Sequence, residues 1–199
     1  MNNNKQFFSE IIESSLHGWL AQSWQWNVFP AFGSLVMAQD AKRTVYGIVY
    51  QVQTGSMDPM RYPFTYQMTQ EQLLAEQPQI FEFLKTTFHC LTVGYVQKGK
   101  TYYLVCPEPM PIHTFVGQVS KEQLQQFFAH QNYLHILFGF ASQVANMDEL
   151  LLAVLRNLAH EGLLTTDKFG AFIDNYSLLT GNDYRRLKLF VQRAECLLV

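Results

Sequence analysis

The stretch RYPFTYQMTQEQLLAEQPQIFEFLKTTFHCLTVGYVQKGKTYYLVCPEPMPIH, Arg61–His113, decides the fold of this chain. It starts in turn-forming residues and continues as an amphipathic, helix-like segment at Thr69–Phe88. A strand-like run follows at His89–Val96, and the stretch closes on the proline-broken segment Cys106–Phe115. Helix, strand and chain-crossing signals so close together indicate a small sheet structure with short inserted helices.

The helical part of this stretch has clear start and stop signals. Thr69 is a good N-cap, and Gln72 three residues later completes a capping-box pattern. Pro78 interrupts that helix and suits the first turn of a second one. We expect the second part to present a broad apolar face, made of Ile80, Phe81, Phe83, Leu84 and Phe88. The glutamates of the segment read as solvated charges rather than as an acid/base pair, at Glu71, Glu76 and Glu82.

The strand part predicts a hairpin followed by an edge segment. Cys90–Val96 and Thr101–Cys106 are the expected strands, joined by a tight turn at 98–100. Prolines then alternate at 107, 109 and 111, and each removes a backbone donor. This segment therefore cannot be a central strand and should cross or border the sheet.

Upstream of this stretch, we predict a helical lid over residues 1–30 and then a hairpin. Apolar residues recur at helical spacing in Phe7–Leu20. Trp24 and Trp26, close behind Trp19, could form a platform for a partner or ligand, or could pack on the protein's own core. Phe32–Val52 reads as two strands, in which Gly47 marks a bulge or bend. Gly94 is expected to mark curvature in the same way.

From Ser120 onward the pattern becomes helical. Ser120, Asn132 and Asp148 each begin an expected helix, and Gly162 is a natural C-cap. Two more helical segments complete the chain, at Thr165–Gly181 and Asn182–Val199. The sequence thus predicts an α+β protein: a small closed or partly closed β-barrel with inserted short helices at 31–118, and an all-helical domain at 119–199. Without a flexible linker between them, the two parts should pack together.

Composition favours a protein partner or self-association. Charged residues make up only 15% of the chain, and aromatic residues also make up 15%. So few charges should leave apolar surface uncovered, although a surface of uncharged Gln and Asn is the alternative. Net charge is −2 with no long run of either sign, which disfavours direct nucleic-acid binding. The apolar runs are too short for a spanning helix of about 20 residues, and the N-terminus does not read as a signal peptide.

Candidate site residues are few. The segment TGSMDPM, Thr54–Met60, lacks the spacing and the helix of a phosphate loop, so Asp58 is expected in an ordinary turn. His113 is the most notable histidine, but no partner for it can be named from the sequence, and a structural or interface role is favoured. Arg61 is grouped with Asp58 and His113 as a candidate ligand-contacting set. Arg185 and Arg186, next to Lys188, form the one dense basic cluster, suited to an acidic partner or to a solvated helix face.

The cysteines suggest a reducing compartment. Cys90, Cys106 and Cys196 are odd in number and widely spaced, so we expect buried thiols rather than disulfides or a zinc site. No metal or other cofactor is predicted, and a cytoplasmic location is the expectation.

Several motifs taken together resemble a known family. The helix with EQPQIFEFL, the strand pattern F-x-C-x-x-V-G, and the segment ending IHTFV are similar to proteins with the HerA–ATP synthase barrel, the HAS-barrel. The resemblance covers roughly residues 33 to 196 and includes DELLLAVL and GNDYRRLKLF in the helical part. It implies a small barrel like the N-terminal domain of ring-forming ATPases, where the barrel mediates ring assembly or partner contacts. This chain has no Gly-x-x-x-x-Gly-Lys-Ser/Thr loop, so the ATPase engine of that class is missing.

These observations predict a non-enzymatic interaction or assembly module, which could dock on a HerA-type ring ATPase or a DNA-processing complex. Two alternatives remain open at this point. One is a small-ligand-binding or enzymatic barrel that uses the region around His113. The other is a small barrel that binds single-stranded nucleic acid by aromatic stacking.

Overall fold

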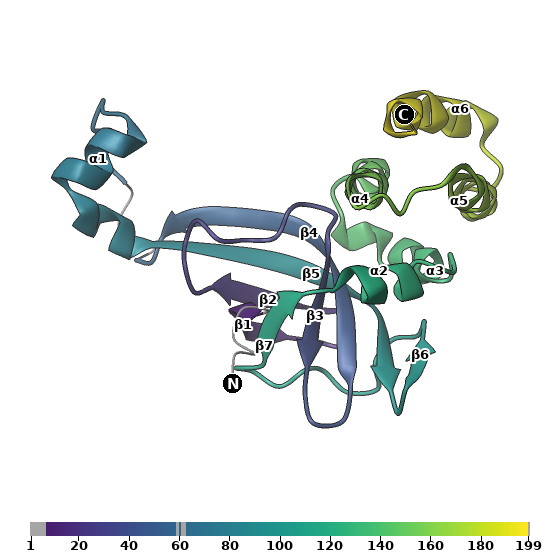
Figure 1. Cartoon of the computed structure of the whole chain (residues 1–199), viewed down its shortest axis with the longest axis horizontal. Helices are drawn as coiled ribbons and strands as arrows, with labels where there is room; N and C mark the ends of the chain where they lie inside the picture. Colours follow the sequence, from purple (N-terminus) through teal and green to yellow (C-terminus); the bar gives the residue numbers. More distant parts are fainter. Residues whose placement is uncertain (1–6, 59, 61–62, 199) are drawn as a thin grey trace.

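A closed antiparallel barrel forms the centre of the computed structural model, which describes residues 7–58, 60 and 63–198 (Figure 1). Within these residues the ring order is β2–β1–β7–β3–β4–β5, and β5 pairs with β2 to close it. A short strand, β6, pairs antiparallel with the C-terminal end of β5. The strands are β1 (Phe7–Ser14), β2 (Gly18–Ser23), β3 (Leu35–Gln39), β4 (Thr44–Ser56), β5 (Leu84–Gln97), β6 (Lys100–Tyr102) and β7 (Phe115–Gln118). The α+β class and the barrel are confirmed.

Both faces of β3, β4 and β5 are covered, which explains their continuous apolar runs. In β3, Val36 and Ala38 belong to the cluster inside the barrel, and the alternate residues Leu35 and Met37 belong to the cluster shared with the helices. The cluster that includes Leu35 and Met37 also contains residues of the helices, so the barrel and the helices share a core. The predicted packing of the two halves is therefore confirmed.

Glycines allow the barrel to curve and close. A Cβ at Gly18 would lie 2.0 Å from the Cys90 carbonyl oxygen, so only glycine permits the close β2–β5 pairing. A Cβ at Gly47 would lie 2.5 Å from the ring of Trp19, which packs on it. The β4–β5 register shifts between Tyr46 and Gly47, where Val93 is the extra residue of β5 between the partners Thr92 and Gly94. The irregularity predicted at Gly47 is therefore present, with the bulged residue on the neighbouring strand.

The predicted N-terminal helix is wrong. The described part of residues 1–30 supplies strands β1 and β2 of the barrel, not a helical lid. Ser9 and Ser23 are buried, so the buried positions of these strands are not all apolar and the period-2 pattern is weak. Ser9 is satisfied there, because its hydroxyl donates to the Val116 carbonyl at 3.3 Å.

The helices after the barrel gather at one end of it (Figure 1). The change from strand to helix falls between β7 and Ser120, which caps the first helix in a capping box with Gln123. The apolar α4 is the most buried of these helices. The elements are α2 (Lys121–Phe127), α3 (Tyr133–Gly139), η3 (Ala141–Gln143), α4 (Met147–His160), α5 (Thr166–Leu179), α6 (Tyr184–Ala194) and η4 (Glu195–Leu197).

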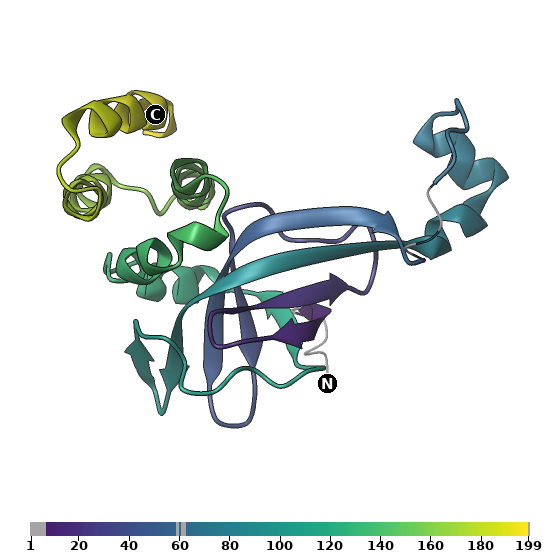
Figure 2. The ribbon, with the colours of Figure 1, turned by 180° about the vertical axis from the view of Figure 1, so that it is seen from behind.

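At the opposite end, β4 and β5 continue past the barrel as a two-stranded extension (Figure 2). At its end lie α1 (Gln70–Glu76) and the 3-10 helix η2 (Pro78–Phe83). The predicted capping box of Thr69 and Gln72 is present, and Pro78 opens η2 as expected. Phe88 does not belong to the helical face predicted for it, because it lies in β5 and is fully buried in the barrel core.

No helix in the described part of the chain combines the length and the apolar character that crossing a membrane would require.

Candidate functional site

The most exposed feature of the molecule is the arm, by which we mean residues 57–83 at the end of the β4–β5 extension. None of its described residues is buried, although the segment contains two helical elements. Helices in globular proteins usually gain their stability by packing an apolar face. The helical elements of the arm therefore lack the packing against other elements that stabilises most helices.

Large apolar side chains are concentrated on the arm. Phe64 is 82% exposed and Met60 is 89% exposed. Scattered exposed apolar residues are ordinary on a protein surface, but a concentration on one projecting segment indicates a binding surface. The exposed apolar residues of the arm are Met57, Met60, Phe64, Tyr66, Met68, Leu74 and Phe83.

The base of the arm is held firmly. The Met57 amide donates to the Phe83 carbonyl at 2.8 Å, which joins the two ends of the arm. Trp26 stacks on Phe81 with ring centroids 5.2 Å apart, and its carbonyl accepts a hydrogen bond from the Thr86 hydroxyl. The arm is thus fastened at its base while its outer residues stay uncovered.

The charge of the arm is acidic. Glu71, Glu76 and Glu82 are exposed, and none of them forms an ion pair with another described residue. Glu71 lies in the first turn of α1, where a negative charge is favoured by the helix dipole. The expectation that these glutamates are solvated charges is consistent with their positions.

A second notable surface lies on α6, at the other end of the molecule. It surrounds a hollow of about 390 Å³ between α4 and α6. We call this the α6 hollow; it is lined by Asp148, Asp183, Arg185, Arg186, Leu189, Phe190 and Arg193.

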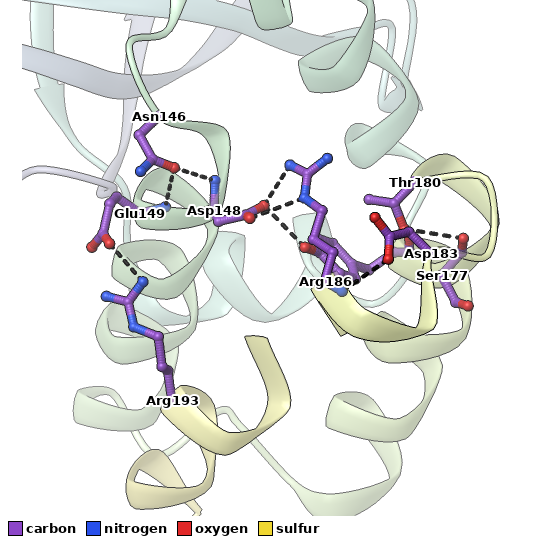
Figure 3. Close-up of polar contacts among 9 residues, drawn as sticks. Asn146, Asp148, Glu149, Ser177, Thr180, Asp183, Arg186 and Arg193 are labelled. Atoms are coloured by element: carbon purple, nitrogen blue, oxygen red, sulfur yellow. Dashed lines mark hydrogen bonds and ion pairs between the residues drawn. The ribbon is translucent and has the colours of Figure 1, made fainter. Parts of the chain in front are cut away.

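Two ion pairs fasten α6 beside this hollow (Figure 3). Arg186 forms a bidentate pair with Asp148, and Arg193 lies 2.6 Å from Glu149. The hydrogen bond from Arg193 lowers the pKa of Glu149 below its ordinary value. Burial raises the pKa of Tyr176, whose hydroxyl donates to Asp148, above its ordinary value. These contacts hold α6 against α4 and α5.

The outer side of α6 remains basic and partly apolar. Arg185 and Lys188 are exposed, and neither pairs with an acidic group among the residues that the structure describes. Leu189 is 55% exposed beside them. The predicted basic cluster is thus divided, because Arg186 is used within the fold while Arg185 faces solvent.

His113 has a partner that the sequence did not reveal. Its Nδ1 lies 2.5 Å from Glu10 Oε1, and its amide donates to the Ile11 carbonyl at 2.9 Å. Its φ of 69° lies in the left-handed region. The side chain is 79% exposed. The geometry therefore shows His113 holding the proline-broken segment against β1 at the surface.

The other predicted site residues that the structure describes lie in separate places. Asp58 lies in the arm, where its carboxylate accepts from the Met60 amide at 2.9 Å. His113 lies against β1 of the barrel, and the arm projects away from the barrel (Figure 1). Arg61 lies outside the described residues. Trp24 is half-exposed, with its ring edge-on to Phe115 at 5.2 Å. Among the described residues, Asp58 and His113 are therefore not brought together.

The cysteine prediction needs one correction. Cys90 and Cys106 are buried, but Cys196 is exposed after the end of α6 because η4 turns it toward solvent. In the described ranges, no group of three or more His, Cys, Asp or Glu side chains is placed to hold a metal ion.

No protein-family model matches this chain, and no curated protein matches it either. The surfaces of the chain itself are therefore the basis for assigning a function.

Proposed function

We propose that this protein is a non-enzymatic interaction module that docks on another protein through the arm. The observation that carries the proposal is the burial pattern: the arm contains two helical elements and several large apolar side chains, yet none of its described residues is buried. Apolar surface removed from water contributes about 25 cal/mol per Å². A partner that covers these side chains would supply the burial that the arm lacks.

The size and construction of the arm suit docking. One side of a standard protein interface contains about 20–30 residues, and the arm is of this size. The firm base at Trp26 and Phe81 limits the conformational freedom lost on binding, which is a main cost of association. Phe64 and Tyr66 supply aromatic side chains of the kind that dominate binding energy at interfaces.

A ring-forming ATPase of the HerA type is the first class of partner to test. The resemblance of residues 33–196 to HAS-barrel proteins points to such rings or to DNA-processing complexes built on them. The chain itself has no nucleotide-binding loop of that class, so it would act as a docking subunit. A cytoplasmic location is part of this proposal, because Cys90 and Cys106 are unpaired thiols.

Capture from native lysate tests the proposal. The baits are the full chain, a variant with residues 57–83 replaced by a short Gly-Ser turn, and the surface variant Lys98→Glu as a control far from the arm. Purified HerA-type ATPase is added in a parallel assay. We expect the full chain and the control to retain a protein that the arm replacement releases.

The opposite result is equally clear. If the full chain captures no other protein, binds no second copy and is a monomer by light scattering, the proposal is wrong. Equal capture by the full chain and the arm replacement would also contradict it, because binding would then reside elsewhere.

A further inference from the structure

We propose that the arm of one copy docks on the outer side of α6 of a second copy, so that the protein self-associates head to tail. This proposal rests on the proposed function, because it names the partner of the same arm. Two surfaces of the described structure carry it: the uncovered acidic and apolar arm, and the uncovered basic and apolar face of α6.

The two surfaces are complementary in charge. The arm presents Glu71, Glu76 and Glu82, and α6 presents Arg185 and Lys188 on its outer side. Between described residues, none of these five groups is engaged in an ion pair. Opposite charges at an interface steer encounter and fix its register, and two unsatisfied sets of opposite sign on one chain favour contact between copies.

The two surfaces are also complementary in shape and polarity. The α6 hollow of about 390 Å³ includes Leu189 and Phe190 among its lining residues. Arg186 and Arg193 of this hollow are paired with Asp148 and Glu149, but Arg185 has no acidic partner among the described residues. An apolar group with a neighbouring carboxylate could therefore contact both Leu189 and Arg185. The arm offers this pairing at Glu82 and Phe83, where Phe83 is 59% exposed. The apolar groove beside Leu35 and Val154 has no arginine or lysine among its lining residues, so it offers no such cation to the acidic arm.

The arm and α6 cannot meet within one molecule. They lie at opposite ends of its longest axis in both views (Figures 1 and 2). A contact between them must therefore join two copies through different patches, which is a heterologous interface. Such an interface builds a closed ring if the rotation between copies closes, and an open filament if it does not.

Charge reversal on each surface is the first test, using Glu76→Lys on the arm and Arg185→Glu on α6. Neither change disturbs its own helix: Glu76 ends α1, where a lysine is favoured, and Arg185 lies near the start of α6, where a glutamate is favoured. Glu13→Lys and Lys98→Glu, both exposed and away from these surfaces, are the matched controls. Light scattering should show a mass that rises with concentration for the native chain and the controls. Each reversal should weaken this association about tenfold or more, and added salt should weaken the native association too.

Mixing the two reversed variants is the sharper test. The Arg185→Glu variant keeps a native arm and the Glu76→Lys variant keeps a native α6, so a head-to-tail contact allows a native pairing between them. The two reversed surfaces are also opposite in charge to each other. The mixture should therefore associate more strongly than either variant alone at the same concentration. A face-to-face contact of identical patches predicts no such rescue, and absence of this gain would overturn the proposal.

The outcomes separate this proposal from the proposed function. A native chain that is monomeric at every concentration, while its arm still captures a different protein, overturns head-to-tail association and leaves the interaction module standing. Reversed variants that associate as strongly as the native chain also overturn it. If replacement of the arm changes neither mass nor capture, both proposals fail.

Discussion

Arg186 binds Asp148 through two parallel hydrogen bonds, from Nε to Oδ2 at 3.0 Å and from Nη2 to Oδ1 at 2.7 Å. Tyr176 adds a third, because its hydroxyl donates to Oδ1 at 3.0 Å. Residues of α4, α5 and α6 thus meet at one carboxylate (Figure 3). The position of the basic face of α6 depends on this junction.

Asp148→Asn should lower the free energy of unfolding by about 1–2 kcal/mol, because it removes the charge of a bidentate pair that is partly exposed to solvent. Denaturant unfolding followed by circular dichroism measures this change. Asp174→Asn, at an exposed position in α5, is the control and should change stability by less than about 0.5 kcal/mol. Equal effects of the two variants would show that the junction contributes nothing specific.

Gly18→Ala should destabilise the barrel by about 3 kcal/mol, because the new Cβ would meet the Cys90 carbonyl where β2 and β5 close the ring. Gly55→Ala is the matched control, since nothing lies within 4 Å of a Cβ there. It should be neutral or slightly stabilising. Thermal unfolding of the two variants compares them directly, and similar melting temperatures would argue against close β2–β5 pairing.

Replacement of residues 57–83 by a short Gly-Ser turn should leave the melting temperature of the rest within about 3 °C of the native value. The reason is that no described residue of the arm is buried, so its removal exposes little of the core. Calorimetry gives this value. A large drop in melting temperature would mean that the arm packs on the barrel and serves the fold rather than a partner.

Cys196 should react with a thiol reagent much faster than the other two cysteines at neutral pH. It is exposed, whereas burial raises the pKa of both Cys90 and Cys106 and keeps them as unreactive thiols. Mass spectrometry after brief alkylation identifies the modified residue. Because Cys196 follows α6 closely, self-association should slow its labelling, and concentration-independent labelling would count against contact at this face.

The free energy of unfolding should fall as the pH rises above about 10, which is the ordinary pKa of a tyrosine side chain. Burial raises the pKa of Tyr133 and Tyr176, so the folded protein keeps these protons while the unfolded chain releases them. The stabilisation is therefore complete below about pH 10 and is lost above it, at about 1.4 kcal/mol per pH unit for each group. Tyr133→Phe should flatten this slope in denaturant titrations, while Tyr184→Phe, at an exposed position, should not.

Local signals in the sequence were reliable guides to this fold. The capping box predicted at Thr69 is present, and Ser120 caps its helix as expected. The register shift beside Gly47 and Gly94 was also predictable, since glycine in a strand usually marks a bulge or bend. Strands β1 and β2 were missed because buried Ser9 and Ser23 hide the alternation that identifies a strand.

The candidate surfaces were harder to predict because they depend on distant residues. Glu10 is 103 residues from His113, and Asp148 is 38 residues from Arg186, so neither pair has a local signal. The apolar face at Phe81 and Phe83 was visible in the sequence. An apolar helix face indicates that another surface packs on it, but the pattern does not show whether that surface belongs to the same chain or to a partner.

The most direct test of the arm as a docking element is a photo-crosslink from its outer end. A benzophenone amino acid in place of Phe64, which is 82% exposed, would be irradiated in native lysate and with the purified protein. We predict a covalent adduct with a second polypeptide, and with the purified protein an adduct to residues 184–193 of another copy. Irradiation that yields only unlinked chain in both samples would contradict the account.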